Sequence, residues 1–262
     1  MHLFLAPHFD DAVYSCGGLI HQLTTAKKPV VVRTIMGGRP HPERTPQTPV
    51  VQELHTRWGQ ADPVAARVAE DEAAVLSLGA KAGHLVNWLD CIYRMTRDGQ
   101  ALYPTGESIF AGINPLDMTA QLLPTMVLSP EETVDVVYVP LAAGNHVDHL
   151  IVRNWGLELA KQYRWLTVKF YEDYPYIATA GELEKALAFF KGADESLHLE
   201  PEVIPLKEEN VAAKVNAVGL YASQLSSFWS DAAAMNTAVR ETLTKTGDGT
   251  PAERYWQLPG RA

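Results

Sequence analysis

The sequence predicts an α/β protein in which parallel strands are joined by crossover helices. Short apolar runs rich in β-branched residues alternate along the chain with longer segments of helical periodicity. The chain has 262 residues, of which 47% are hydrophobic, so it can fill a sizeable core. Two long polar segments, residues 37–62 and 93–115, directly follow predicted strands, where open α/β sheets bind their ligands.

The predicted strands are short and mostly apolar. They cover residues 3–6, 30–35, 84–89, 134–139 and 167–171. The helices predicted between them cover residues 13–27, 63–78, 116–128 and 148–163. The second of these helices has the clearest pattern, because Pro63 suits a first helical turn and Gly79 follows the last apolar position as a stop.

The pattern weakens after residue 171. It predicts an apolar helix at 183–190, an alternating stretch at 195–206 and a further helix at 207–225. The chain shows no internal repeat, no low-complexity segment and no clear linker. We therefore expect one domain over residues 1–262, in which residues from about 172 to 262 form a C-terminal extension packed on the sheet.

The charge and composition of the chain indicate which partners and which cellular location to expect. The net charge of −9 would repel a nucleic acid backbone over most of the surface, so we expect no nucleic acid partner. The first residues lack the basic and apolar regions of an export signal, and no run of about 18 apolar residues occurs. We expect a cytoplasmic protein with no membrane insertion, and the apolar C-terminal segments are compatible with a homo-oligomer. Cys16 and Cys91 are expected to be small buried residues.

A polar cluster follows the first predicted strand. The sequence Pro-His-Phe-Asp-Asp occupies residues 7–11, at the entry to the first helix. If these residues form a tight turn, His8 and Asp11 project to the same side while Asp10 points elsewhere. His and Asp together suit Zn²⁺ or Fe²⁺, but two ligands make a weak site and a third is needed.

A second cluster, Gly-Asn-His-Val-Asp-His-Leu at residues 144–150, follows the fourth predicted strand. His146 and His149 are three residues apart, with Asp148 between them. Because the carboxyl ends of parallel strands open onto the same crevice, the two clusters can meet. Aspartates after strands are also ordinary helix caps, but two clusters with three His and three Asp favour a metal site.

Metal-assisted hydrolysis explains how these residues would divide the work. Three protein ligands with an open position bring the pKa of a bound water to about 7, and a nearby uncoordinated carboxylate takes its proton. Asp10 suits this role as general base. His146, held by Asp148, suits protonation of a leaving nitrogen or stabilisation of an oxyanion.

These motifs resemble those of a known family. The Pro-His-Phe-Asp-Asp turn resembles the [AP]HPDD signature of the LmbE/PIG-L zinc-dependent N-deacetylases, to which GlcNAc-PI de-N-acetylase belongs, and His-Val-Asp-His resembles their second motif. Three more segments resemble family motifs in the same order: RVAEDEAAVLSLG, KVNAVGLYASQ and AERYW. The resemblance therefore covers most of the chain.

The family implies a Rossmann-like three-layer sandwich, with a mostly parallel sheet flanked by helices and a metal site at the carboxyl ends of the strands. It also implies hydrolysis of the acetamide of an N-acetylated amino sugar or a related small molecule. Residue by residue, the resemblance implies the metal ligands His8, Asp11 and His149, the base Asp10, and the electrostatic or acid group His146 oriented by Asp148. It further places Arg67 and Asp90 where family members contact the sugar. Either Zn²⁺ or Fe²⁺ suits these ligands.

Three other functions fit the same residues. The first is an amidase acting on a different small N-acyl or thiol-conjugate substrate. The second is an Fe²⁺ enzyme for oxygen chemistry, which gives no reason for the free Asp10. The third is a metal- or sugar-binding protein without turnover, because Phe9, Ala12 and Gly144 depart from the family pattern. Tyr174 and Tyr176 are candidates for the rim of the site in all of them.

Overall fold

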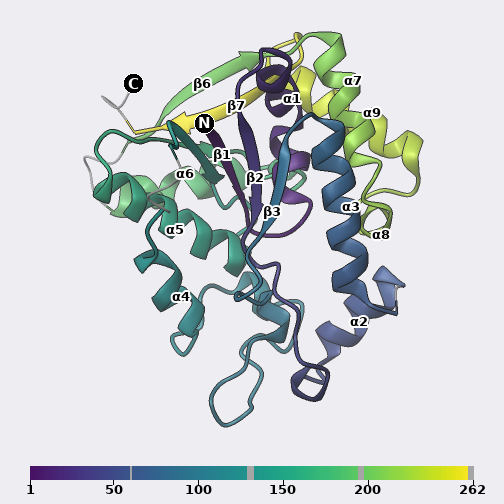
Figure 1. Cartoon of the computed structure of the whole chain (residues 1–262), viewed down its shortest axis with the longest axis vertical. Coiled ribbons are helices and arrows are strands. Elements are labelled where there is room, and N and C mark those ends of the chain that lie inside the picture. The colour runs from purple at the N-terminus through teal and green to yellow at the C-terminus, as the bar shows by residue number, and fades with distance from the viewer. Residues whose placement is uncertain (60, 129–132, 194–197, 259–262) are drawn as a thin grey trace.

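The computed structural model describes residues 1–59, 61–128, 133–193 and 198–258. Within these residues a sheet of seven strands has the order β3-β2-β1-β4-β5-β7-β6 (Figure 1). Its strands are β1 (His2–Ala6), β2 (Val30–Thr34), β3 (Lys81–His84), β4 (Val136–Pro140), β5 (Thr167–Tyr171), β6 (Glu200–Pro205) and β7 (Ala252–Gln257). Strands β1 to β5 pair in parallel, and β7 pairs antiparallel with both β5 and β6.

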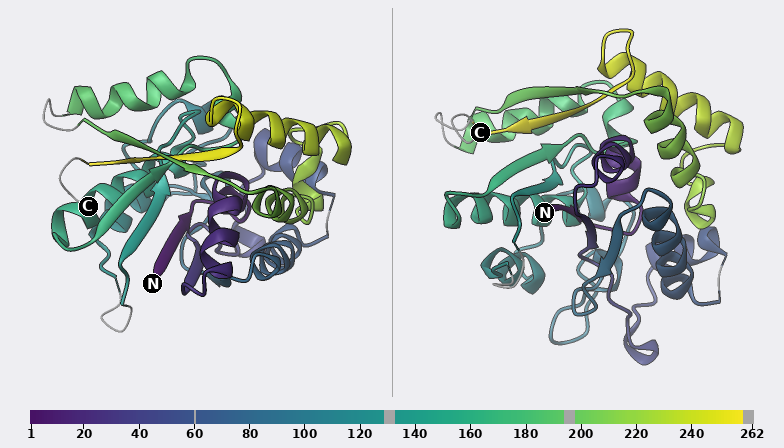
Figure 2. Two further views of the ribbon diagram at one scale, coloured as in Figure 1. Left: turned by 90° about the horizontal axis from the view of Figure 1, so that it is seen from above. Right: turned by 45° about the horizontal axis from the view of Figure 1, so that its top comes forward.

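Helices cover both faces of the sheet (Figure 2). They are α1 (Asp11–Thr25), α2 (Pro49–Trp58), α3 (Pro63–Ser77), α4 (Met118–Leu122), α5 (Val147–Gln162), α6 (Glu182–Ala193), α7 (Glu208–Val218), α8 (Ala222–Leu225) and α9 (Ala232–Thr246). Helices α1, α3, α7 and α9 pack on one face, and α4, α5 and α6 pack on the other. Phe4 of β1 faces the first core and Leu5 the second, which explains why this strand is apolar from Leu3 to Ala6. The predicted three-layer α/β fold is confirmed.

The third strand differs from its prediction. The sequence predicts a strand at 84–89, but β3 covers Lys81–His84 and pairs with residues 31–34 at the edge of the sheet. An edge strand does not need a continuous apolar run, so its polar sequence gives little signal. The chain leaves the sheet after His84, and the apolar Val86 is 70% exposed.

The predicted helix at 116–128 is also too long. Helix α4 ends at Leu122, and residues 123–125 form a 3₁₀ turn. Pro124 lacks the backbone N–H that a continuing α-helix requires, so the helical pattern cannot extend through it.

Two helices occur where the sequence predicts none. Helix α2 lies inside the segment 37–62, with Thr48 Oγ1 accepting a hydrogen bond from the Val51 N–H at 3.3 Å and Pro49 in its first turn. Helix α9 begins after Asp231, whose carboxylate caps it. In the sequence, the signal for both helices is a capping residue. The short apolar face of α2 is difficult to recognise because the residues around this helix are rich in proline.

The C-terminal part of the chain adds to the sheet as well as packing on it. Strand β6 forms in the predicted alternating stretch, of which residues 195–197 lie outside the described part of the chain. Strand β7, which contains the AERYW segment, lies between β5 and β6. None of the helices in the described ranges combines the length and the hydrophobicity needed to cross a membrane.

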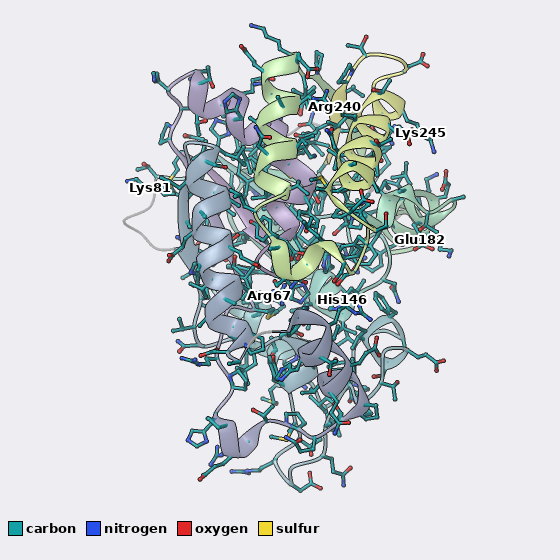
Figure 3. All side chains as sticks on the ribbon, turned by 90° about the vertical axis from the view of Figure 1, so that its right-hand side faces the viewer. Arg67, Lys81, His146, Glu182, Arg240 and Lys245 are labelled. Carbon is teal, nitrogen blue, oxygen red and sulfur yellow. The ribbon has the colours of Figure 1, made fainter. Side chains whose placement is uncertain are left out.

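The carboxyl edge of the sheet contains a topological switch point. The chain proceeds from β1 to β2 and β3 on one side, whereas β4 and β5 lie on the other side of β1. Ligands of open α/β sheets bind at such a point. The two polar clusters follow β1 and β4, and Figure 3 shows His146 at the same level of the molecule as Arg67 of α3. A small apolar cluster from α2 and the segment 91–109 covers this edge.

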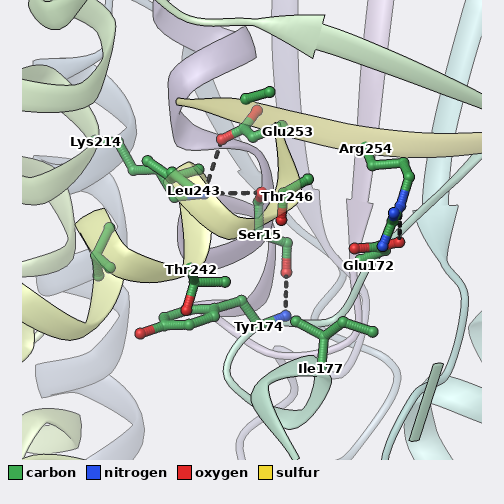
Figure 4. Close-up of a pocket in the computed structure, with 12 residues that line it drawn as sticks. Ser15, Glu172, Tyr174, Ile177, Lys214, Thr242, Leu243, Thr246, Glu253 and Arg254 are labelled. Atoms are coloured by element: carbon green, nitrogen blue, oxygen red, sulfur yellow. Dashed lines mark hydrogen bonds and ion pairs between the residues drawn. The ribbon is translucent and has the colours of Figure 1, made fainter. Parts of the chain in front are cut away.

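A buried ion pair ties the C-terminal elements to the middle of α1 (Figure 4). Lys214 of α7 donates to Glu253 of β7 at 2.8 Å and to the Ser15 carbonyl at 2.9 Å. Glu253 in turn accepts hydrogen bonds from the backbone N–H groups of Gly18 and Leu19, both at 2.9 Å. The two side chains thus hold the helix whose first turn carries Asp11.

We expect Lys214→Met to lower the free energy of unfolding by about 3–5 kcal/mol, because it leaves the Glu253 carboxylate buried and unpaired. The matched control is Lys161→Met, which removes an exposed pair with Glu158 and should cost no more than about 1 kcal/mol. Urea unfolding of both variants measures the difference. Equal losses would show that burial of the Lys214 pair has no special consequence.

Candidate metal centre and its cavity

The turn between β1 and α1 brings His8 and Asp11 together. Asp11 Oδ2 accepts a hydrogen bond from the His8 backbone N–H at 2.7 Å and lies 3.2 Å from His8 Nδ1. Asp11 is the first residue of α1, where the helix dipole also favours a carboxylate. The three-residue spacing therefore places the two side chains on one side of the turn, as the sequence predicts.

His149 approaches the same carboxylate oxygen from α5. Its Nε2 lies 3.3 Å from Asp11 Oδ2, but this nitrogen is buried and has no hydrogen bond of acceptable geometry to any described residue. Its Nδ1 lies 2.6 Å from Asp173 Oδ1. An ionised carboxylate only accepts hydrogen bonds, so Asp173 holds a proton on Nδ1 of His149. This tautomer leaves the lone pair of Nε2 available to bind a metal ion.

The electrostatics of this cluster favour a positive charge. Burial alone would lower the pKa of His149, but Asp11 and Asp173 together raise it to about 9. Burial would likewise raise the pKa of Asp11, but His149 and His8 hold it well below its usual range. A divalent cation would satisfy the same carboxylates in place of protons on the two imidazoles.

The residues present therefore fit a metal ion. An orphaned buried imidazole nitrogen and a carboxylate oxygen near two imidazoles are donors that Zn²⁺ and Fe²⁺ prefer. Three groups in the described residues have donor atoms that all lie within 4.8 Å of one another, and none of the three contains Asp11. They are His8 with His146 and His149, Cys91 with His146 and Asp148, and His8 with Asp90 and Asp148.

Asp10 pairs with Arg67 and not with the histidines. Arg67 Nη2 donates to Asp10 Oδ1 at 3.3 Å, and its Nη1 lies 3.9 Å from Asp90 Oδ2. The guanidinium is held over the ring of Trp58, with its carbon 4.8 Å from the ring centroid. Burial raises the pKa of Asp10 and Arg67 opposes this shift. The residue predicted as a base is thus a buried carboxylate outside the cluster around Asp11.

Asp148 contacts His146 differently from the prediction. The Asp148 backbone N–H donates to His146 Nδ1 at 3.2 Å, whereas its carboxylate accepts from Arg94 and lies 3.0 Å from His8 Nε2. The Cys91 N–H also donates to this carboxylate, at 2.9 Å. The guanidinium of Arg94 satisfies this fully buried carboxylate, and the hydrogen bond from Asp148 to His146 is made by the main chain and not by the side chain.

Two residues of this network are absent from the predicted site. Asp173 lies two residues after the end of β5, at the same sheet edge as the two clusters, and this placement was an available signal. Arg94 lies in the segment 93–115 and also pairs with Asp117, at 3.2 Å. Nothing in the local sequence distinguishes Arg94 from a solvated loop arginine.

A cavity of about 280 Å³ opens beside the cluster. Its polar lining includes His8, Asp10, Asp11, Arg67, Asp90 and His146. Its walls are largely apolar and aromatic: Val50, Leu54, Trp58, Ile92, Ile109, Phe110, Tyr174, Pro175, Tyr176 and Phe228. A pocket with apolar walls and a few convergent polar groups is typical of a small-molecule site. Both tyrosines predicted at the rim line it.

Gly144 allows Tyr176 to reach this cavity. The glycine has a φ of 85°, and a Cβ added there would lie 2.7 Å from the Tyr176 ring atoms Cγ and Cδ1. The Tyr176 ring stands edge-on to His149, with 5.6 Å between the ring centroids. The departure from the family pattern at residue 144 thus leaves room for an aromatic side chain from another part of the chain.

We expect Gly144→Ala to lower the free energy of unfolding by about 2–4 kcal/mol, from the left-handed backbone and the clash with Tyr176. Gly99→Ala is the matched control, because its φ of 86° is nearly the same and no atom in the described part of the chain lies within 4 Å of the added Cβ. It should cost only about 1–2 kcal/mol. Thermal and urea unfolding test this, and an equal cost at both positions would mean that the Tyr176 contact is unimportant.

The fold and the cavity define an α/β protein with a buried His and Asp cluster, suited to a divalent metal ion, at the switch point of its sheet. The chain belongs to the PIG-L family. The family model described as "PIG-L: GlcNAc-PI de-N-acetylase" matches residues 3–160, more than half of the chain. The family predicted from the motifs is therefore confirmed.

Named relatives of the chain are deacetylases. The chain is 26% identical over 249 residues to 2'-N-acetylparomamine deacetylase of Niallia circulans, covering 87% of this chain and 89% of the relative. Its fold matches the zinc-inhibited form of teicoplanin deacetylase with a TM-score of 0.77, 27% identity and coverage of 97% and 96%. It also matches A40926 pseudoaglycone deacetylase with a TM-score of 0.74, 28% identity and coverage of 100% and 98%.

Proposed function

We propose that this protein is a metal-dependent N-deacetylase that removes an acetyl group from a small N-acetylated amino sugar or sugar conjugate. The observation that carries the proposal is the position of Asp10, a buried carboxylate that lines the cavity beside a His and Asp cluster without belonging to it. Family membership and the activities named for the relatives support the same reaction class.

The proposed metal ligands are His8, Asp11 and His149, with Zn²⁺ as the resident ion and Fe²⁺ as the alternative. An ion held there would supply Lewis acidity, which polarises an amide carbonyl and brings the pKa of water to about 7. The Asp173 carboxylate supports this set by holding the His149 ring in position.

Asp10 is the proposed general base. Its pairing with Arg67 fixes the direction of the carboxylate, while burial keeps it more basic than a solvated aspartate. It would accept the proton of the attacking water and later deliver it to the leaving nitrogen. Arg67 and Asp90 border the same cavity and are proposed to hydrogen-bond hydroxyl groups of the sugar.

His146 is proposed to stabilise the oxyanion. Its Nδ1 accepts the Asp148 N–H, so its proton sits on Nε2. The ring lines the cavity edge-on to His8, with 4.9 Å between the centroids. An N–H donor fixed in this way can bond the amide oxygen as negative charge develops on it.

We expect Asp10→Asn to retain its metal but to lose at least about 100-fold in kcat, because the amide cannot accept a proton. The assay measures primary amine released from N-acetylglucosamine, 2'-N-acetylparomamine and other N-acetylated sugars by Zn²⁺-loaded and Fe²⁺-loaded protein. Asp11→Asn is the control and should lose metal and activity together. Wild-type turnover by Asp10→Asn would remove Asp10 as the base.

Asp173→Asn should weaken the binding of Zn²⁺ by about 10–100-fold, since a neutral amide supports the basicity of His149 less than a carboxylate does. Competition against a chromophoric chelator measures this affinity. An unchanged affinity, with the fold intact by circular dichroism, would place the ion away from His149.

A further inference from the structure

A further buried cation lies one helical turn beyond the candidate metal centre. Arg153 follows His149 by four residues on α5, so the two side chains share a helix face. Arg153 is only 4% exposed. Its Nε and Nη2 donate to Asn154 Oδ1 at 3.3 and 3.2 Å, and its guanidinium carbon lies 3.5 Å from the ring centroid of Phe189.

This guanidinium has no carboxylate partner in the described part of the chain. No Asp or Glu oxygen of these residues lies within 4.0 Å of its nitrogens, and its Nη1 makes no hydrogen bond to them. The other buried arginines near the site, Arg67 and Arg94, are both paired with aspartates. Buried arginines are normally paired because an unpaired buried charge is costly. Arg153 therefore departs from the pattern of its neighbours.

Arg153 lines a second cavity, of about 580 Å³, which we call the Arg153 cavity. Its other lining residues are Phe110, Ala142, Gly144, Asn145, Leu150, Glu182, Lys185, Ala186 and Phe189. Phe110 also lines the active-site cavity, so the two cavities are neighbours. In Figure 3, Glu182 lies on the side of His146 away from Arg67, which places the Arg153 cavity on the opposite side from the Asp10 and Arg67 pair.

The charges in this cavity leave an excess of positive charge. Among the residues that the structure describes, Glu182 is the one acidic residue in the lining, and its carboxylate is already engaged by Lys185 at 2.6 Å and by the Gly144 N–H at 3.1 Å. Arg153 is thus the cation in this lining that has no carboxylate partner in the described ranges. Burial lowers the pKa of Arg153 to about 10, with Asp173 opposing the shift, so the side chain remains a cation at neutral pH.

We propose that the Arg153 cavity binds a small oxyanion, a carboxylate or phosphate group, through the free edge of the Arg153 guanidinium. A planar guanidinium held flat against Phe189 presents its N–H groups in a fixed direction, which suits the oxygens of such a group. The oxyanion is either a substituent of the substrate that reaches past Phe110 or a separate anion. The site itself does not depend on the deacetylase function.

The test is calorimetric titration of the wild-type protein with inorganic phosphate. Arg153→Gln should weaken phosphate binding at least 10-fold. Arg153→Lys keeps the charge but loses the planar fork, so its affinity for phosphate should lie between those of the wild-type protein and Arg153→Gln. Lys161→Gln is the matched control, because it removes one positive charge from the same helix outside this cavity, and it should bind as wild type does. Asp11→Asn should also retain binding, which excludes phosphate held at a metal ion.

Three results would overturn the proposal: no saturable binding by wild type, unchanged binding by Arg153→Gln, or loss of binding in Asp11→Asn. Circular dichroism melts check that the Arg153 variants fold. If Arg153→Gln does not fold, Arg153→Lys decides the matter, since unchanged affinity there would show that the guanidinium fork is not the ligand.

A second arm identifies the source of the oxyanion. If the oxyanion belongs to the substrate, the wild-type protein should have a lower KM for N-acetylglucosamine 6-phosphate than for N-acetylglucosamine. Arg153→Gln should then raise the KM for the phosphorylated sugar and leave the KM for N-acetylglucosamine unchanged. If the anion is separate, Arg153→Gln should leave both KM values unchanged while still losing phosphate binding. Absence of amine release from either sugar would count against the proposed function, while the phosphate titration would still decide the Arg153 cavity.

Discussion

One carboxylate oxygen joins the two halves of the candidate site. Asp11 Oδ2 receives the His8 N–H, and it also lies beside the imidazole nitrogens His8 Nδ1 and His149 Nε2. This convergence requires β1 and β4 to be adjacent parallel strands, because His8 follows one and His149 the other. The sheet order is thus the constraint on which the candidate metal centre depends, and the C-terminal ion pair of Lys214 and Glu253 secures the helix that carries Asp11.

The aspartates near Asp11 have different cationic partners. Arg67 engages Asp10, and Arg94 engages Asp148, whose carboxylate also lies 3.0 Å from His8 Nε2. Asp173 is buried as well, but it bonds to His149 from the side opposite the cluster. Four buried aspartates near one another are tolerated because each is paired with an arginine or a histidine. That arrangement leaves Asp10 at the cavity wall, where the proposed mechanism assigns it the role of general base.

The sequence predicts the parts of this structure that depend on local chemistry. Strand β1 is buried on both faces and therefore apolar, and the two His and Asp motifs have fixed spacing, so their meeting point follows from parallel topology. Contacts made across long separations are harder to predict. Asp148 and His149 are paired with Arg94 and Asp173, which belong to no local sequence motif. The close approach of the Tyr176 ring to Gly144 is likewise visible only in the three-dimensional structure. The sequence prediction misplaces edge strand β3, because an edge strand does not need a continuous apolar run.

The proposed mechanism requires a divalent ion at the position between His8, Asp11 and His149. Anomalous X-ray diffraction at the zinc edge, from crystals grown with Zn²⁺, would locate such an ion. We expect one strong peak within coordinating distance of His8, Asp11 and His149, with Asp10 outside the ligand sphere. A peak bounded by Cys91, His146 and Asp148, a peak bounded by His8, Asp90 and Asp148, or the absence of any peak would contradict it.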